Sequence, residues 1–445
     1  MKARVKVKST TRGIARGFAL IIMAGTLLLN LPVSIKSGEG NLLNALFTAT
    51  SATCVTGLIV VDTYQNWTIF GQLVIISLIQ IGGIGFMTIG VYISIRLKKK
   101  IGLYERETLH ESVNTLEVAG VVKLVKKIVQ GTLLIEGIGA ILLMTRFVPR
   151  FGVEKGIYFS VFHSISAFCN AGFDLMGIDG EYSSLMQFEN DMVVNLVVMS
   201  LILIGGIGFI VWDDILVHKW HVREYLLHTK IVLMTTVVIT VITTILFLLF
   251  ENHHMFQNMS VQEKILGALF SCVTPRTAGF NTVDTAELTE ASKVLSMILM
   301  FIGGSPGSTA GGAKTTTMVV LFFYAIAMIR NHEDINLFGR RLTQDVVKKA
   351  NAVVVINMTL ALCAALAMMA MQPFSFTDVM FEVLSAINTV GMTTGITREL
   401  NEVSKVILMI LMFCGRLGSL SFAFIFAQKS SMDVIRQPQE KIVVG

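Results

Sequence analysis

Charged residues are scarce in this sequence of 445 residues. They make up 15% of it, against about 25% in ordinary globular proteins, while hydrophobic residues make up 53%. The mean hydropathy of +0.70 is too high for a soluble multidomain enzyme. Only six prolines occur, and the absence of low-complexity runs argues against long disordered regions. The composition therefore excludes a soluble protein and predicts one embedded in a membrane.

Cysteine is also sparse, and its arrangement excludes further classes. The five cysteines show neither a CxxC pair nor a Cys/His spacing, which argues against a disulfide framework and a zinc site. The basic residues separate apolar runs instead of covering one soluble face, so we expect no nucleic-acid partner. No nucleophile with a neighbouring base stands out, so we expect no enzyme and no cofactor in this chain.

Long apolar runs alternate with short ones along the whole sequence. A transmembrane helix needs roughly 20 apolar residues, whereas a run of about 10–14 is typical of a re-entrant segment. Eight long runs occupy residues 14–31, 69–95, 123–147, 192–217, 229–250, 293–329, 346–371 and 403–427. Four short runs lie near 41–56, 157–171, 262–277 and 376–390. We therefore predict an all-α polytopic membrane protein with eight spans and four re-entrant segments.

The distribution of charge predicts the orientation in the membrane. Segments 1–16, 96–127, 213–230, 330–349 and 428–445 together hold 25 Lys and Arg but 12 acidic residues. By the positive-inside rule these segments are cytoplasmic, so both termini are predicted on the cytoplasmic side of the cell membrane. The opposite side has a net charge of −9. This charge would concentrate cations at an entrance, although acidic outer loops can also simply mirror the topology rule.

The order long, short, long recurs four times, and the copies align. The short runs end in SATCVTGL, SAFCNAGF, VTPRTAGF and SAINTVGM, each with a glycine at the same place. We divide the chain accordingly into repeat 1 (1–95), repeat 2 (96–218), repeat 3 (219–330), repeat 4 (331–428) and a cytoplasmic tail (429–445). Each repeat is expected to contain a membrane helix, a pore helix and a second membrane helix, in a quasi-fourfold arrangement around one central pore.

The glycine-ended loops are candidates for an ion filter. Irregular backbone at membrane depth is tolerated only where protein buries it or where it lines a watery cavity. Glycine permits positive φ and leaves carbonyl oxygens unhindered, and rings of carbonyls can replace the hydration shell of potassium. The short helix before each loop would direct its partially negative C-terminal end at the cation. The candidate filter residues are Thr56, Gly57, Asn170, Ala171, Gly172, Thr277, Ala278, Gly279, Thr389, Val390 and Gly391.

The second long run of each repeat contains a further aligned string. These strings are IGGIGF (81–86), IGGIGF (204–209), IGGSPG (302–307) and CGRLGS (414–419). Their small residues would let helices pack closely in lipid. In the fourth string Arg416 replaces the second glycine. An arginine deep within a membrane run is a functional hypothesis by default, here as a barrier to cations, a partner of an acid or a contact of a gate. The buried Glu136 has no partner that the sequence identifies.

Glycines and a proline interrupt the third of these runs, so a continuous helix is not expected there. We interpret the interruption as a flexible gating loop beneath the filter. A merely kinked helix is an alternative. A phosphate-binding loop is disfavoured, because Ala313 separates glycine from lysine and no strand precedes. The candidate gate residues are Gly303, Gly304, Ser305, Pro306, Gly307, Ser308, Thr309, Ala310, Gly311, Gly312, Ala313, Lys314 and Arg416.

With these motifs the chain resembles the Trk/Ktr/HKT superfamily of potassium transporters, and within it the membrane subunits of bacterial Ktr systems. The resemblance implies potassium uptake through a channel-like pore, with sodium dependence possible. It also implies a homodimer and a cytosolic ring of KtrA-type regulatory subunits that bind ATP or ADP. Glycine in all four loops implies potassium selectivity, whereas serine in the first goes with sodium permeation. The third loop departs from the pattern at Val273, Pro275 and Arg276. A cation-coupled carrier with rocking repeats and a midplane site is the alternative function.

Overall fold

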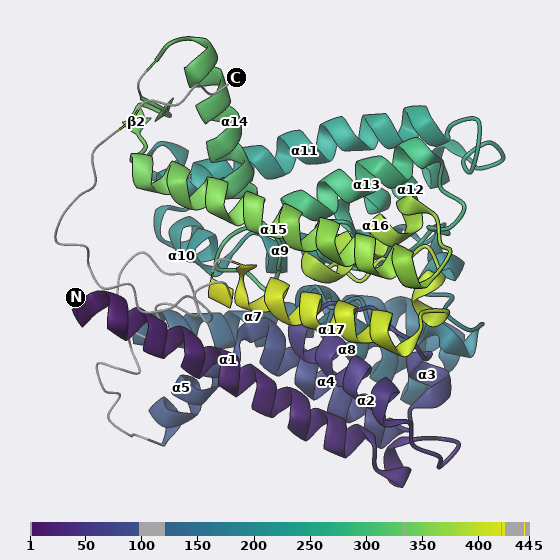
Figure 1. Ribbon diagram of the computed structural model, residues 1–445. Helices are drawn as coiled ribbons and strands as arrows, with labels where there is room; N and C mark the ends of the chain where they lie inside the picture. Colours follow the sequence, from purple (N-terminus) through teal and green to yellow (C-terminus); the bar gives the residue numbers. More distant parts are fainter. Residues whose placement is uncertain (1, 98–120, 333, 420, 423–439, 441–445) are drawn as a thin grey trace.

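The computed structural model describes the chain except residues 1, 98–120, 333, 420, 423–439 and 441–445 (Figure 1). The predicted tail 429–445 and most of the segment 96–127, which is predicted to be cytoplasmic, therefore lie outside the described residues. The expectation of an all-α protein is confirmed, since the described strands form only one short antiparallel hairpin. The first half contains α1 (Lys2–Leu29), α2 (Leu42–Cys54), α3 (Thr63–Asn66), α4 (Ile69–Ile84), α5 (Phe86–Arg96), α7 (Val121–Phe151), α8 (Val153–Phe168), α9 (Met192–Gly206) and α10 (Phe209–His218). The second half contains α11 (Leu227–Glu251), α12 (Val261–Val273), α13 (Glu290–Ile302), α14 (Thr315–Ile329), β1 (Asn336–Leu337), β2 (Arg340–Arg341), α15 (Gln344–Met371), α16 (Phe376–Ile387) and α17 (Glu402–Leu417).

Three of the short apolar runs begin as helices with a polar cap. The side chain of Asn41 accepts hydrogen bonds from the amides at the start of α2. Ser260 and Glu263 form a reciprocal capping box on α12, and Ser375 caps α16. Such caps satisfy the free amides of a helix N-terminus. They start these three helices in polar segments and leave each short helix ending near its glycine loop.

The number of uninterrupted spans differs from the sequence prediction. Among the described residues, four helices are long and apolar enough to cross a membrane, or up to six if two bent pairs count as single spans. The runs 69–95 and 192–217, each predicted as one span, bend by 87° between α4 and α5 and by 94° between α9 and α10. Gly85 (φ 88°) and Gly208 (φ 102°) lie at these bends. A left-handed residue cannot continue an α-helix, so the last glycine of IGGIGF ends the span.

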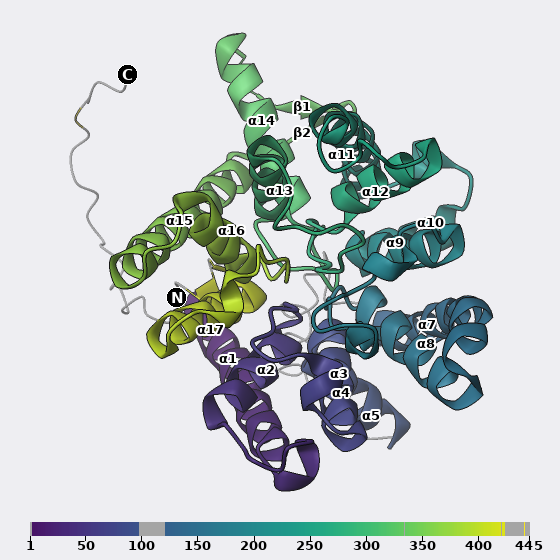
Figure 2. The same cartoon turned by 90° about the vertical axis from the view of Figure 1, so that its right-hand side faces the viewer.

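The helices follow one another around a common centre in chain order (Figure 2). Each short helix packs against the long helix that precedes it, as in the pairs α1–α2, α7–α8, α11–α12 and α15–α16. The next long helix of each segment contacts the short helix of the following segment: α4 contacts α8, α9 contacts α12, and α13 contacts α16. Finally α17 contacts α2 and closes the circle. We call the four segments units 1 to 4; their predicted boundaries stay a prediction.

Candidate ion pathway

The four glycine loops have the same backbone conformation. Their glycines have positive φ angles: 91° at Gly57, 70° at Gly172, 83° at Gly279 and 90° at Gly391. Two positions earlier in each loop, a residue with a side chain is also left-handed: Val55 (58°), Asn170 (59°), Thr277 (75°) and Thr389 (51°). Non-glycine residues adopt this region rarely, and a β-branched residue there is a genuine outlier. Three β-branched residues and one asparagine share this conformation at matching positions, which indicates that the surrounding structure imposes it.

The same glycines meet one another in a closed ring. At each of them an added methyl group would lie closer than 3.0 Å to a carbonyl oxygen of the next unit. These contacts run from Gly57 to Ala171, from Gly172 to Ala278, from Gly279 to Val390 and from Gly391 back to Thr56. All eleven predicted filter residues therefore come together in one place. A side chain at any of the four contact positions would strike the neighbouring backbone unless the loops shift apart.

Hydroxyl groups at the ends of the short helices brace these loops. Ser51 and Ser385 accept hydrogen bonds of 3.0 Å from the amides of Gly57 and Gly391. Ser166 donates to the carbonyl of Phe173 at 2.7 Å. This accounts for the recurring serine six residues before the glycine. Unit 3 has Val273 instead, but Thr274 donates to the carbonyl of Phe280 at 2.6 Å. Thr274 thus compensates for the missing serine at position 273, a role that the sequence did not indicate.

On the side predicted to face outward, the ring opens into a cavity of about 240 Å³. Its charged lining residues in the described part of the chain are Asp174, Glu181, Asp284 and Arg398. The guanidinium of Arg398 stacks 3.5 Å above the ring of Tyr182. Burial, reinforced by the nearby Asp62, raises the pKa of Asp174 to about 7. We call this space the outer vestibule. None of its charged residues was selected from the sequence, although the net negative charge of the outer side pointed to it.

Beneath the ring, a glycine in the second long run of units 1, 2 and 4 lies against the short helix of the same unit. A methyl group on Gly82, Gly205 or Gly415 would lie closer than 3.0 Å to the carbonyl oxygen of Thr53, Phe168 or Ile387, respectively. Each of these carbonyls belongs to the residue four positions before the ring glycine. The long helix of units 1, 2 and 4 therefore contacts the C-terminal end of the short helix backbone to backbone, as the small residues predicted.

In unit 3 the helix ends and the chain forms a loop instead. Residues 303–314 connect α13 to α14 without helical structure, so the alternative of a merely kinked helix is not what the structure has. The amides of Ser305 and Thr309 donate to the carbonyls of Gly206 (3.0 Å) and Gly205 (3.3 Å) in unit 2. On the other side, Gly311 lies against Thr389 in unit 4. The loop thus passes below the ring from unit 2 to unit 4.

Arg416 ties this loop to unit 1. Its guanidinium donates to the carbonyl of Thr309 in the loop and to the carbonyls of Gly82 and, at 3.0 Å, Gly83. Within the described part of the chain it forms no ion pair with a carboxylate. Lys314, at the end of the loop, donates to the carbonyls of Ala310 (2.6 Å) and Gly311 (3.0 Å). The predicted gate residues therefore lie together, and two cationic side chains are held there by backbone carbonyls.

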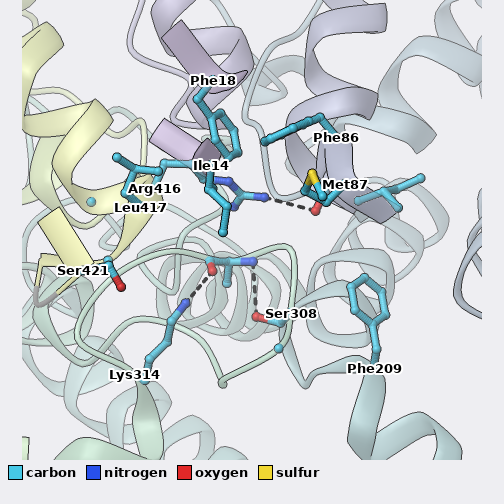
Figure 3. A pocket seen from close by; sticks show the side chains of 17 residues that line it. Ile14, Phe18, Phe86, Met87, Phe209, Ser308, Lys314, Arg416, Leu417 and Ser421 are labelled. Carbon is cyan, nitrogen blue, oxygen red and sulfur yellow. Dashed lines mark hydrogen bonds between the residues drawn. The ribbon is translucent and has the colours of Figure 1, made fainter. Parts of the chain in front are cut away.

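These two cationic side chains line an inner cavity of about 170 Å³. Figure 3 shows Arg416 and Lys314 around this space with Phe18, Met87 and Phe209. An ion passing down from the ring would meet the loop and both positive charges. Glu136, whose partner could not be predicted, accepts a hydrogen bond of 3.1 Å from Gln80 and lies outside this cavity.

Comparison with known proteins identifies the family. A family model described as TrkH, cation transport protein, matches residues 3–435. The chain belongs to this family. The resemblance to the Trk/Ktr/HKT superfamily is thereby confirmed, as is the expectation of a membrane ion transporter and not an enzyme.

The relatives of this TrkH-family chain match it over nearly its whole length. It is 39% identical to the potassium/sodium uptake protein NtpJ of Enterococcus hirae, over 100% of this chain and 99% of that protein. It is 40% identical to the Ktr system potassium uptake protein B of Bacillus subtilis, over 97% of this chain and 96% of that protein. The solved structure of the potassium transporter TrkH from Vibrio parahaemolyticus has the same fold, with a TM-score of 0.73 and 20% identity over 93% of this chain and 85% of that chain.

Proposed function

We propose that this protein carries potassium into the cell through the ring of four glycine loops. The closed ring supports the proposal, because a loop carbonyl lies against the glycine of the neighbouring unit in each of four matching contacts. A ring of carbonyl oxygens can replace the hydration shell of a potassium ion. The names of the relatives support the choice of ion: NtpJ is a potassium/sodium uptake protein, and the Bacillus subtilis protein is a potassium uptake protein.

The conformation of the loops supplies the chemistry of this filter. In each loop, left-handed residues two positions apart flank Thr56, Ala171, Ala278 or Val390. This alternation lets successive carbonyls turn to the same side, toward the axis. The short helices α2, α8, α12 and α16 end at these loops, and their C-termini add partial negative charge for a cation. The acidic residues of the outer vestibule raise the local concentration of cations before they enter.

The loop 303–314 acts in our proposal as the gate. It crosses beneath the ring and is held on three sides by units 1, 2 and 4. Arg416 stabilises this closed position through its hydrogen bonds to Thr309 and to Gly82 and Gly83, and its charge adds an electrostatic barrier. Opening requires that these hydrogen bonds break and that the loop withdraw from the axis.

We further propose that the chain is the pore subunit of a Ktr-type complex, as a homodimer with a cytosolic regulatory ring that binds ATP or ADP. The names of two Bacillus subtilis relatives, Ktr system proteins B and D, support such an assignment. The docking surface would include the cytoplasmic segments 96–127 and 330–349. In the second of these, the β1–β2 hairpin presents exposed Arg340 and Arg341.

The decisive experiment measures uptake of potassium, rubidium and sodium into vesicles that contain the purified protein, beside a Gly57→Ser variant. We expect the native protein to pass potassium and rubidium and to exclude sodium. The serine variant should lose this selectivity, since its side chain would strike the carbonyl of Ala171. Equal passage of all three ions by the native protein, or an unchanged Gly57→Ser variant, would remove the ring as the filter and favour the carrier mechanism.

Shortening the loop tests the gate separately. Deletion of Ser308–Ala313 removes the segment that crosses beneath the ring and should raise potassium flux while the selectivity over sodium stays. Lowered or unchanged flux through a correctly folded variant would contradict the gate. Size-exclusion chromatography in detergent checks the folding of the variant.

A further inference from the structure

A crevice of about 300 Å³ lies at the periphery of unit 2, between α7, α9 and α10. Its walls are almost entirely apolar, with Ile128, Ile135, Ile207 and Trp212 among them, and its described charged members are Lys127 and Asp213. Gly131 of α7 forms part of its wall, so the indole ring of Trp212 comes within 3.4 Å of where a methyl group on that glycine would be. The crevice is separate from the ring and from the outer vestibule.

In the orientation predicted from the distribution of charge, the crevice lies at the cytoplasmic boundary of the bilayer. Further along α7, Leu133, Leu134 and Ile138 are 60%, 64% and 51% exposed, as expected of a surface in contact with hydrocarbon. At the opposite end, Lys123 and Lys126 are exposed. Because α10 bends away from α9 by 94°, it runs across the direction of the span.

The end of α10 carries an exposed apolar surface at the same boundary. Leu216 and Val217 are 66% and 58% exposed, and the indole of Trp220, two residues beyond the helix, is 94% exposed. Tryptophan is enriched where membrane and water meet. An exposed apolar helix face followed by tryptophan is the pattern of an element lying in the membrane interface. The crevice between α7 and α10 therefore opens toward lipid and not toward the cytosol.

The charges beside the crevice select the kind of lipid. Lys123 lies one turn before Lys127 on the same face of α7, and Lys126 is adjacent. Lys127 is paired with Asp213 at the rim. Lys123 and Lys126 form no ion pair with any residue that the structure describes. Two free ammonium groups at the headgroup level attract a negatively charged phosphate.

We propose that this crevice binds an anionic phospholipid, with an acyl chain against Ile128, Ile135 and Trp212 and the phosphate against Lys123 and Lys126. The walls fit a hydrocarbon chain because they offer it no unpaired polar group. The lysines lie at the end where the headgroup would be. A zwitterionic lipid could fill the same crevice, but it would lack the net charge that the lysines attract.

The site also adjoins the candidate gate. Phe209 lines both the crevice and the inner cavity beneath the ring. Its amide donates a hydrogen bond of 2.7 Å to the carbonyl of Gly307 in the loop 303–314. A lipid that packs against α10 would therefore fix the residue that holds the loop on the side of unit 2. This second step, that the lipid influences opening, rests on the proposed function.

Fluorescence quenching tests the binding step without transport. In a Trp220→Phe variant, Trp212 remains in the crevice and Trp67 is buried elsewhere. The variant is placed in phosphatidylcholine vesicles that contain a minor fraction of brominated phosphatidylglycerol or of brominated phosphatidylcholine. We expect stronger quenching of Trp212 by the brominated anionic lipid. Equal quenching by the two lipids would overturn the proposal.

Two matched pairs of variants locate the site. Gly131→Phe fills the crevice and should abolish the preference, whereas Gly137→Phe, on the same helix with open space around it, should keep it. Lys123→Gln with Lys126→Gln should weaken binding of phosphatidylglycerol by about fivefold for each lysine removed. The outer-side pair Lys155→Gln with Lys405→Gln should not weaken it. A preference that survives in both the Gly131 and the lysine variants would contradict the assignment.

The link to the gate is tested by potassium flux at increasing phosphatidylglycerol content. We expect flux through the native protein to change with the anionic fraction and flux through Gly131→Phe to stay constant. Preferential quenching together with lipid-independent flux would retain the binding site and overturn its link to the loop. Absence of potassium flux at every composition would instead reject the proposed function, while the quenching result would stand on its own.

Discussion

The ring and the layer beneath it are built from aligned parts of the same four units, yet they differ sharply in regularity. In the ring, each unit contributes a glycine of positive φ that touches the carbonyl of its neighbour. One level below, units 1 and 2 retain two glycines, unit 3 has the irregular loop 303–314, and unit 4 has Arg416. The four units are therefore equivalent in the ring but differ from one another in the layer beneath it.

This difference matches the roles proposed for the two levels, the filter and the gate. An ion surrounded by carbonyls needs ligands at similar distances, which four equivalent loops supply. A gate needs an element with two positions, and one loop from one unit can move without moving the others. The hydroxyl of Thr274 shows how strictly the ring is maintained, because it replaces the serine that unit 3 lacks.

Disturbing the ring should have the largest effect, and Gly391 is the position at which to do so. In Gly391→Ala the new methyl group would strike both the carbonyl of Thr56 and the Cα of Gly57. A left-handed alanine adds about 1 kcal/mol of strain. We expect potassium flux to fall by about a hundredfold in vesicles, since the loops of units 4 and 1 must separate.

A control at Gly38 separates the effect of the collision in the ring from the effect of backbone strain at a positive φ angle. Gly38 also has a positive φ, 76°, but has no atom within 4 Å of an added methyl group. Gly38→Ala therefore carries a similar strain without a collision in the ring and should keep nearly native flux. Equal flux in the two variants would mean that the ring does not require close contact at Gly391.

Disturbing the layer beneath should act in the opposite direction. Arg416→Ala removes the hydrogen bonds that hold the loop to unit 1, and hydrogen bonds of charged groups contribute about 1.5–3 kcal/mol each. We expect potassium flux to rise by about tenfold while the preference for potassium over sodium stays. Arg416→Lys keeps the charge but loses the planar fork of hydrogen-bond donors. Its potassium flux should therefore lie between that of the native protein and that of Arg416→Ala. A variant that folds normally, by thermal unfolding, and shows native flux would exclude Arg416 from the gate.

The regularity of the ring is also why it was predictable from sequence. Each ring glycine belongs to a short string that recurs, so Gly57, Gly172, Gly279 and Gly391 could be aligned without a structure. Arg416 and the loop were noticed for the converse reason, since they break the repeat where the other units keep it. Contact with the gate was one of the roles predicted for Arg416, and the structure has it. Its individual hydrogen bonds could not be predicted, because its acceptors are backbone carbonyls, which have no signature in the sequence.

The sequence prediction was least accurate in the IGGIGF strings, because a glycine there can either let helices pack closely or end a helix. The strings around Gly82 and Gly205 suggested close packing, which the structure has, but their last glycines, Gly85 and Gly208, end the helix. Hydropathy alone does not separate a packed glycine from a left-handed one, because both lie within an unbroken apolar run. The outer vestibule escaped selection because Asp174, Glu181 and Asp284 share no spacing: they lie two, nine and five residues after the preceding ring glycine.

The smallest predicted effect extends the comparison outward, from the ring to the vestibule that feeds it. Burial and the nearby Asp62 raise the pKa of Asp174 to about 7, so this carboxyl is mostly charged at pH 8 and mostly neutral at pH 6. A unit charge near the entrance changes the local energy of a cation by about 0.5 kcal/mol in water. Potassium uptake should therefore fall by about twofold as the external pH is lowered from 8 to 6.

Two variants check this assignment. Asp174→Asn should show the lower rate at both pH values. Asp179→Asn should retain the native pH dependence, because Asp179 pairs with Arg150 away from the vestibule. A native pH profile in Asp174→Asn would mean that another group senses the proton, and that the vestibule does not contribute to uptake through this carboxylate.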